Sequence, residues 1–133
     1  MTHPLSKFLG RATLVALAAL PGASLAPAPA FAQCIPPLGL TGYWRGNDQG
    51  DYYIRQIGTD VWWVGLDATT AGKGWTHAFR GTRVGNTIRG SWADVRGNVG
   101  SGSMILAVSG RTMVRTFSSN PNFGGSKWSK RCG

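Results

Sequence analysis

The chain has 133 residues, which suits a single domain behind a short leader. Fourteen Lys and Arg against five acidic residues, all of them Asp, give a formal net charge of +9. With no Glu, two His and two Cys, the chain has little material for acid–base, metal-dependent or thiol chemistry. We therefore expect no enzyme, no metal site and no cofactor.

Residues 1–32 have the pattern of a secretory signal peptide. Lys7 and Arg11 form a basic start, residues 12–20 are apolar, and Ala30-Phe31-Ala32 matches a small-x-small cleavage site. The apolar run is too short to span a bilayer. We expect an exported protein, periplasmic or extracellular, with no integral membrane segment after cleavage.

Cleavage would leave residues 33–133 as one domain and lower the net charge from +9 to +7 by removing Lys7 and Arg11. Cys34 and Cys132 then lie almost at the two ends, and an even pair in an exported protein predicts a disulfide. In the chain-entropy description, closing a loop of this length contributes at most about 4–5 kcal/mol. The pairing requires the two termini to meet.

Between the cysteines the chain has the pattern of an all-β protein. Glycine is frequent, and no window keeps a helical apolar spacing for three turns. Short alternating segments separated by turn residues predict eight strands: 41–45, 51–57, 61–66, 75–84, 87–94, 103–108, 111–117 and 126–131. Eight strands with short connections and joined termini favour an up-and-down antiparallel barrel.

Alternation also predicts which side chains face the barrel lumen. We place the faces that carry arginine outward, including the face of strand 111–117 that holds Arg111, Met113 and Arg115. The pairs Tyr52-Tyr53 and Trp62-Trp63 do not alternate, so their facing stays open. The predicted lumen contains Trp75, Phe79, Ile88 and Trp92.

The segment Gly42-Tyr43-Trp44 resembles the opening of calycin-type barrels, the group that holds lipocalins and avidins. The resemblance implies that a basic residue from the chain end, Lys130 or Arg131, packs over Trp44. If the barrel is filled by its own side chains, we expect Trp44 and Trp128 to plug its closed end. Nearly all of residues 33–133 is similar to a family of small exported β-barrel domains that brings no established activity. Its motifs here are the run from Trp44 to Gly65, the segment 90–95 and the segment 123–128.

The likeness to avidins is narrower. Leu40-Thr41-Gly42-Tyr43-Trp44 followed by Asn47 is similar to the avidin opening, in which an asparagine helps to bind biotin. Asn47 comes one residue late for that pattern, and Asp51 stands where a serine is expected. Biotin binding is therefore a minor alternative.

Catalytic or metal-binding residues are poorly represented after residue 32. His77 is the single histidine there and is more simply read as a hydrogen-bonded interior residue. A Ser–His–Asp site would need Asp67 or Asp94 beside it, without a supporting motif. Asp48 and Asp51 are explained by turn formation.

The aromatic residues are the stronger sign of function. Such rings can line a pocket or stack on sugars, although a small barrel can also be filled by its own side chains. Our candidate ligand-binding residues are Asn47, Asp51, Tyr52, Trp63, Trp75, His77 and Trp92.

We expect a non-enzymatic protein that binds a small molecule or glycan in an aromatic-lined barrel mouth. The alternative is an inhibitor of a secreted hydrolase, acting through loop 67–74 or Ile35-Pro36-Pro37. The basic charge leaves weak association with anionic surfaces open, whereas export makes nucleic acid an unlikely partner.

Overall fold

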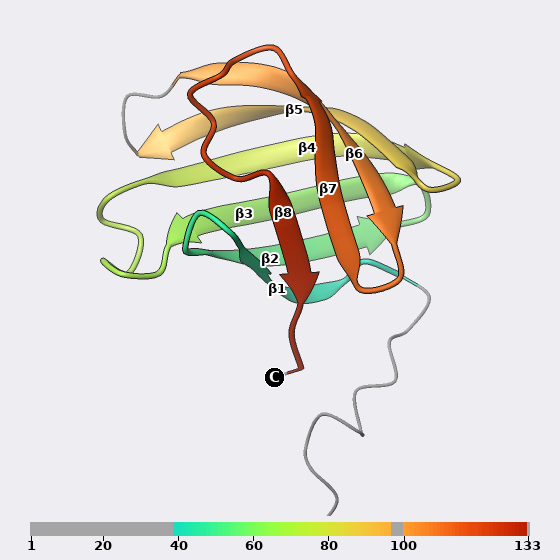
Figure 1. Ribbon diagram of the computed structural model, residues 1–133, viewed down its shortest axis with the longest axis horizontal. Coiled ribbons are helices and arrows are strands. Elements are labelled where there is room, and N and C mark those ends of the chain that lie inside the picture. Colours follow the sequence, from blue (N-terminus) through green and yellow to red (C-terminus); the bar gives the residue numbers. More distant parts are fainter. Residues whose placement is uncertain (1–38, 97–99, 133) are drawn as a thin grey trace, which may run out of the picture.

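The computed structural model describes residues 39–96 and 100–132, and this part of the chain is all β with no helix. Its strands form one closed antiparallel barrel in sequence order, β1 pairing with both β2 and β8 (Figure 1). The strands are β1 (Gly42–Gly46), β2 (Gly50–Ile57), β3 (Asp60–Asp67), β4 (Thr76–Val84), β5 (Thr87–Arg96), β6 (Ser101–Ser109), β7 (Thr112–Ser118) and β8 (Lys127–Lys130).

The predicted barrel and its eight strands are confirmed, with ends that differ by a few residues. Glycines in the turns explain why the strand boundaries could be predicted from the sequence. The β2–β3, β4–β5 and β6–β7 hairpins each hold a glycine at positive φ, a conformation that other residues rarely adopt. These are Gly58, Gly85 and Gly110, at φ 58°, 58° and 54°.

The two ends of the barrel differ. The three tight hairpins gather at one end, which we call the closed end, together with the start of β1 and the end of β8. The longer connections β3–β4 and β7–β8 lie at the other end, the mouth, on the left in Figure 1. The mouth is therefore the end at which loops can shape a site.

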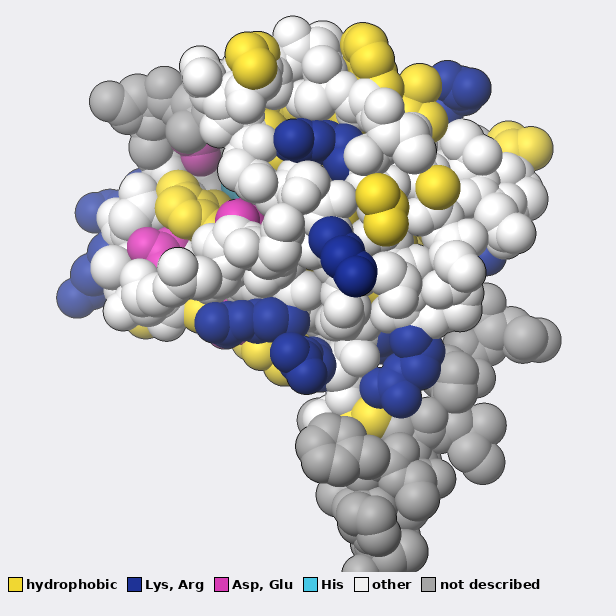
Figure 2. Space-filling model, in the orientation of Figure 1, with side chains coloured by type: hydrophobic (Ala, Val, Ile, Leu, Met, Phe, Trp, Pro, Cys, Tyr) yellow, Lys and Arg dark blue, Asp and Glu magenta, His cyan; other side chains and the backbone are white. Residues whose placement is uncertain are grey.

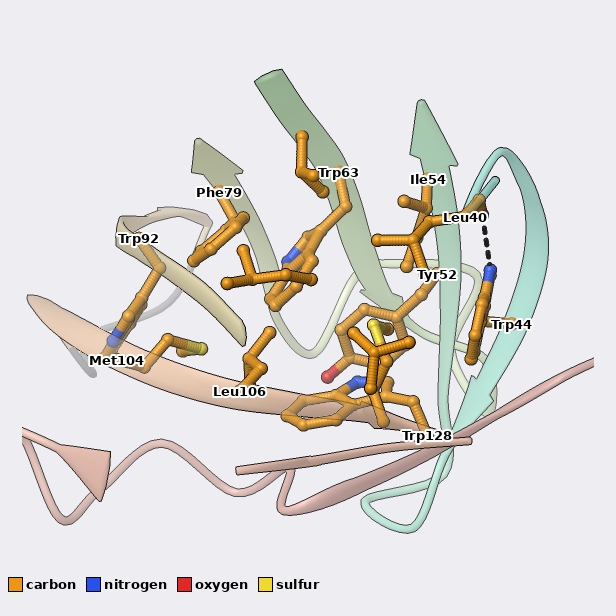
Figure 3. Packing of buried hydrophobic residues seen from close by; sticks show 14 of the residues in the cluster. Leu40, Trp44, Tyr52, Ile54, Trp63, Phe79, Trp92, Met104, Leu106 and Trp128 are labelled. Atoms are coloured by element: carbon orange, nitrogen blue, oxygen red, sulfur yellow. Dashed lines mark hydrogen bonds between the residues drawn. The ribbon is translucent and has the colours of Figure 1, made fainter. Parts of the chain in front are cut away.

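Trp44 closes the barrel at the closed end. Its ring is fully buried, and its Nε1 donates a hydrogen bond of 2.8 Å to the Leu40 carbonyl oxygen (Figure 3). The Lys130 Nζ lies 6.0 Å from the centre of the Trp44 ring and donates to the Gly39 carbonyl oxygen at 3.1 Å. The expected basic residue over Trp44 is thus Lys130.

Trp128 does not share that place. It is fully buried but packs against Tyr52, Trp63 and Phe123, with ring centres 5.7, 5.7 and 6.3 Å away. Phe123 belongs to the connection at the mouth. The prediction that Trp128 plugs the same end as Trp44 is therefore wrong, because its pairing with Gly46 sets it nearer the mouth.

The side chains predicted for the lumen lie there. Phe79, Ile88 and Trp92 are buried, while Trp75 is half-buried and packs against the core at the mouth. The two ambiguous pairs also separate cleanly. Tyr52 and Trp63 point inward (Figure 3), while Tyr53 and Trp62 are 56% and 42% exposed on the outside.

The predicted facing of β7 is wrong. Met113 is fully buried, so the face it shares with Arg111 and Arg115 points inward. The two arginines are only half-buried because they leave toward opposite ends of the barrel. Arg111 donates to the Lys130 carbonyl oxygen at 3.1 Å, and Arg115 donates to the Phe123 carbonyl oxygen at 2.6 Å. Backbone acceptors at the two ends thus make an inward arginine face tolerable.

Two predictions fall outside the described residues. The leader, residues 1–32, lies there, and so does Cys34, so the Cys34–Cys132 disulfide stays a prediction. Within the described ranges, the structure has no helix long and apolar enough to cross a membrane.

Candidate ligand cavity at the barrel mouth

A cavity of about 260 Å³ opens at the mouth. The β1–β2 turn, the β3–β4 connection, strands β4 and β5, and the β7–β8 connection all contribute to it. Figure 2 shows acidic side chains around a hydrophobic patch on this side of the molecule, at the left of the view. The lining residues are Asp48, Trp75, His77, Trp92, Asp94, Asn122, Phe123 and Gly124.

Aromatic rings form the inner surface of the cavity. Trp75 stacks on His77 with ring centres 4.9 Å apart and planes inclined by 6°. Phe123 packs on His77 at 4.6 Å and on Trp92 at 4.7 Å, and Trp92 meets His77 edge-on at 6.0 Å. Each ring is thus held in place by at least one other ring.

Strand pairing brings an acidic residue beside these rings. Asp94 follows Trp92 by two residues on β5, so both face inward. Asp94 is also the cross-strand partner of His77 on β4. The register shifts between Thr76 and His77, at the mouth end of this pair, where irregular pairing often accompanies binding sites.

Asp48 is fixed on the opposite side by its own turn and by the barrel interior. Its Oδ1 accepts from the Gly50 backbone N–H at 3.1 Å, which is a local Asx turn. Its Oδ2 accepts from the Tyr52 hydroxyl at 2.5 Å. The buried Tyr52 therefore positions one carboxylate of the cavity.

Two glycines make room for this arrangement. A Cβ at Gly65 would come within 2.6 Å of both the His77 and the Tyr52 rings. A Cβ at Gly50 would overlap the Trp75 ring and approach Tyr52 to 2.7 Å. The rings can lie this close to the strands only because these positions carry no side chain.

Burial keeps the inner groups of the cavity uncharged. Desolvation lowers the pKa of His77 to about 4, against a smaller opposing effect of the Asp48 and Asp94 carboxylates. Burial, and then the negative charge of Asp48, raise the pKa of Tyr52. At neutral pH His77 and Tyr52 are therefore both neutral, and the negative charge of the cavity comes from aspartates.

Several of the predicted site residues meet at this cavity. Trp75, His77 and Trp92 line it directly. Tyr52 lies behind them, with its hydroxyl 3.5 Å from the His77 Nε2. Trp63 is deeper in the core, stacked on Phe79 with ring centres 3.9 Å apart.

Asn47 and Asp51 are placed differently. The Asn47 side chain accepts from the backbone N–H groups of Ser126 and Lys127, at 2.9 and 3.1 Å, and so ties the β1–β2 turn to the start of β8. Asp51 points out of the barrel, where it accepts from the Tyr43 hydroxyl at 2.7 Å and pairs with Arg45 at 2.5 Å. Neither residue is among those that line the cavity.

The sequence prediction missed five lining residues: Asp48, Asp94, Asn122, Phe123 and Gly124. A signal existed for Asp94, because it shares the inward face with Trp92. Asp48 forms a turn and also lines the cavity, and its role in the turn was enough to explain it in the sequence. Asn122, Phe123 and Gly124 belong to an irregular connection, for which alternation gives no facing.

Within the described part of the chain, no group of three or more His, Cys, Asp or Glu side chains could hold a metal ion. Comparisons with protein families, with curated proteins and with solved structures give no match. The chemistry of the cavity is thus the guide to function.

Proposed function

We propose that the protein is an exported, non-enzymatic binding protein that holds a small molecule or a glycan unit in the mouth cavity. The observation that carries this proposal is a recess in which stacked rings stand beside two carboxylates. Such a combination of apolar surface and a few polar groups is typical of ligand sites. His77 is neutral at neutral pH, and no Ser, Thr or Cys is among the described residues that line the cavity, which favours binding over Ser–His–Asp-type catalysis.

We also propose that the barrel is of calycin type. The arrangement of Trp44 under Lys130 at the closed end supports this, together with the up-and-down order of the strands. A calycin-type barrel closes one end and binds at the other, in agreement with the position of the cavity.

The size of the cavity limits the ligand. Its volume of about 260 Å³ lies just below the roughly 300–1,000 Å³ of ordinary small-molecule pockets. A single sugar ring or a compact metabolite suits this volume better than a fatty acid does. A longer glycan would leave most of its residues outside.

Tryptophan fluorescence provides the test, because Trp75 and Trp92 line the cavity. The purified protein is titrated in turn with each member of a panel of sugars, amines, amino acids and fatty acids. We expect at least one of them to change the tryptophan fluorescence saturably. Trp92→Phe should reduce that change. The matched control Trp62→Phe alters an exposed outside ring and should leave it intact. Silence across the whole panel would overturn the proposal.

Biotin belongs in the panel as the minor alternative. Asn47, the residue of the avidin-like pattern, bonds Ser126 and Lys127 and does not line the cavity. We therefore expect biotin to bind no better than a neutral compound of its size.

Inhibition of a secreted hydrolase remains a second candidate because of the β3–β4 connection. Asp67 accepts from the Thr69 and Thr70 hydroxyls at 2.7 and 2.8 Å, so the loop is held in shape before any partner arrives. Preorganisation of this kind is useful in an inhibitory loop. Inhibition of a protease or lysozyme that disappears in Asp67→Ala, but persists in Trp92→Phe, would favour this function over the cavity.

A further inference from the structure

The cavity has the opposite charge to the rest of the protein. Two of the five aspartates line it, Asp48 and Asp94, whereas the chain as a whole has a formal net charge of +9. Within the described residues, no Lys or Arg is among those that line it. Arg115 comes near, but its guanidinium is bound to the Phe123 carbonyl oxygen and lies 5.8 Å from the centre of the Phe123 ring.

The neutral groups of the cavity do not offset this charge. His77 is only 5% exposed and is uncharged at neutral pH because of its burial. Its Nδ1 has no hydrogen-bond partner in the described structure, so no neighbour fixes a proton there. The Tyr52 hydroxyl donates a hydrogen bond to Asp48 and, with its pKa raised by burial, adds no charge of its own.

Resting on the proposed function, we infer that the ligand is a small organic cation, whose charged nitrogen occupies the mouth cavity. Aromatic faces attract ammonium groups through the electron density of the ring, most strongly in the case of tryptophan. Trp75, Trp92 and Phe123 supply such rings, and Asp48 and Asp94 supply the compensating charge.

Other ligand classes fit these groups less well. An anion would meet two carboxylates, and none of the described residues that line the cavity is basic, which is unfavourable at low local dielectric. A neutral sugar could stack on the rings and accept hydrogen bonds from Asn122, but it would bring no positive charge to the two carboxylates that line the cavity. An organic cation satisfies the rings and the charges together.

The experiment uses ligand pairs that differ in charge but not in shape. Calorimetric titration of the purified protein would compare choline with 3,3-dimethyl-1-butanol, its neutral isostere, and butylammonium with 1-butanol. We expect the cation of at least one pair to bind about tenfold more tightly than its neutral partner, within the range known for cation–aromatic contacts.

Substitutions then test whether the preference for the cation over its neutral isostere comes from the cavity aspartates. Asp94→Asn and Asp48→Asn keep the shape and most hydrogen bonds of the site but remove one charge each, and should reduce the preference severalfold. The control Asp60→Asn changes an aspartate at the closed end and should leave it unchanged.

The outcomes separate this inference from the proposed function. Equal binding of a cation and its isostere, or binding of other panel members while all four of these compounds fail at millimolar concentration, overturns the cation inference and leaves a binding protein. Failure of every compound in the panel overturns both.

Discussion

Tyr52 and Asp48 connect the barrel interior to the cavity. The hydroxyl of the fully buried Tyr52 donates to the Asp48 Oδ2 at 2.5 Å, and Asp48 lines the mouth. The same tyrosine packs against Trp63, Trp75, His77 and Trp128. A carboxylate in the site is thus held by a residue whose other neighbours form the core.

Tyr52→Phe should destabilise the fold by about 1–2 kcal/mol. It removes a hydrogen bond to a charged group and leaves the Asp48 Oδ2 without its donor. Urea unfolding followed by circular dichroism would measure the loss. Tyr53→Phe is the control, since that ring is 56% exposed. Equal stability of the two variants would contradict a stabilising contribution of the Tyr52–Asp48 hydrogen bond.

Gly65→Ala should cost about 1–3 kcal/mol, because an added methyl would press on the His77 and Tyr52 rings at 2.6 Å. Thermal unfolding is a suitable measurement. Gly124→Ala makes a fair comparison at the mouth, because its Cβ would meet the Asp48 side chain at an ordinary 3.5 Å. A variant at Gly65 as stable as the one at Gly124 would show that the rings are not confined.

Acid should destabilise the protein through His77. Its folded pKa of about 4 lies below the unfolded value of 6.5, so the unfolded chain binds more protons between these values. The stability due to the neutral ring is complete above pH 6.5 and is lost as pH falls to about 4. Over this window the free energy of unfolding should fall by a few kcal/mol.

His77→Gln provides the control for this pH dependence. The fall between pH 6.5 and 4 should become shallower in the variant, whatever its stability at neutral pH. The two proteins carry the same aspartates, so the difference between their pH profiles reports on His77. An identical pH profile for both proteins would be incompatible with a buried neutral His77.

Lys130→Met should lower stability by about 1–2 kcal/mol. The change removes a hydrogen bond to the Gly39 carbonyl oxygen and the cation over the Trp44 ring, but keeps an apolar chain of similar length. Chemical denaturation measures the effect. Lys127→Met, at an exposed position on the same strand, should be nearly neutral. A larger loss of stability in Lys127→Met than in Lys130→Met would argue against Lys130 as the residue that closes the barrel over Trp44.

The fold was more predictable than the site, for physical reasons visible in single residues. Alternation and glycine turns determine strands locally, so the barrel followed from the chain. Trp92 was found because a strand fixes its facing. Phe123 was not found, since it lies in an irregular connection, where alternation gives no facing, and its contact with His77 joins segments far apart in the sequence.

Charged residues were the main source of error. Arg111 and Arg115 were placed outward by charge alone, yet both find backbone carbonyl oxygens at the barrel ends. Asp51 was expected in the site, but an outward salt bridge with Arg45 accounts for it. A long or paired polar side chain can thus find hydrogen-bond or salt-bridge partners in several positions. The alternation of the strand does not predict which of these positions it takes.

The pairing of β1 with β8 brings the two ends of the described chain to the closed end, on the far side of the barrel from the mouth cavity. The chain can therefore be rejoined at this end and opened elsewhere without changing which strands pair. Residues near 39 and 132 could be joined by a short peptide, and the chain reopened at the Gly85-Asn86 turn, where Gly85 has open space around it. Such a circular permutant would carry new termini and an unaltered mouth, so a fluorescent reporter could be attached without touching the residues that line the cavity.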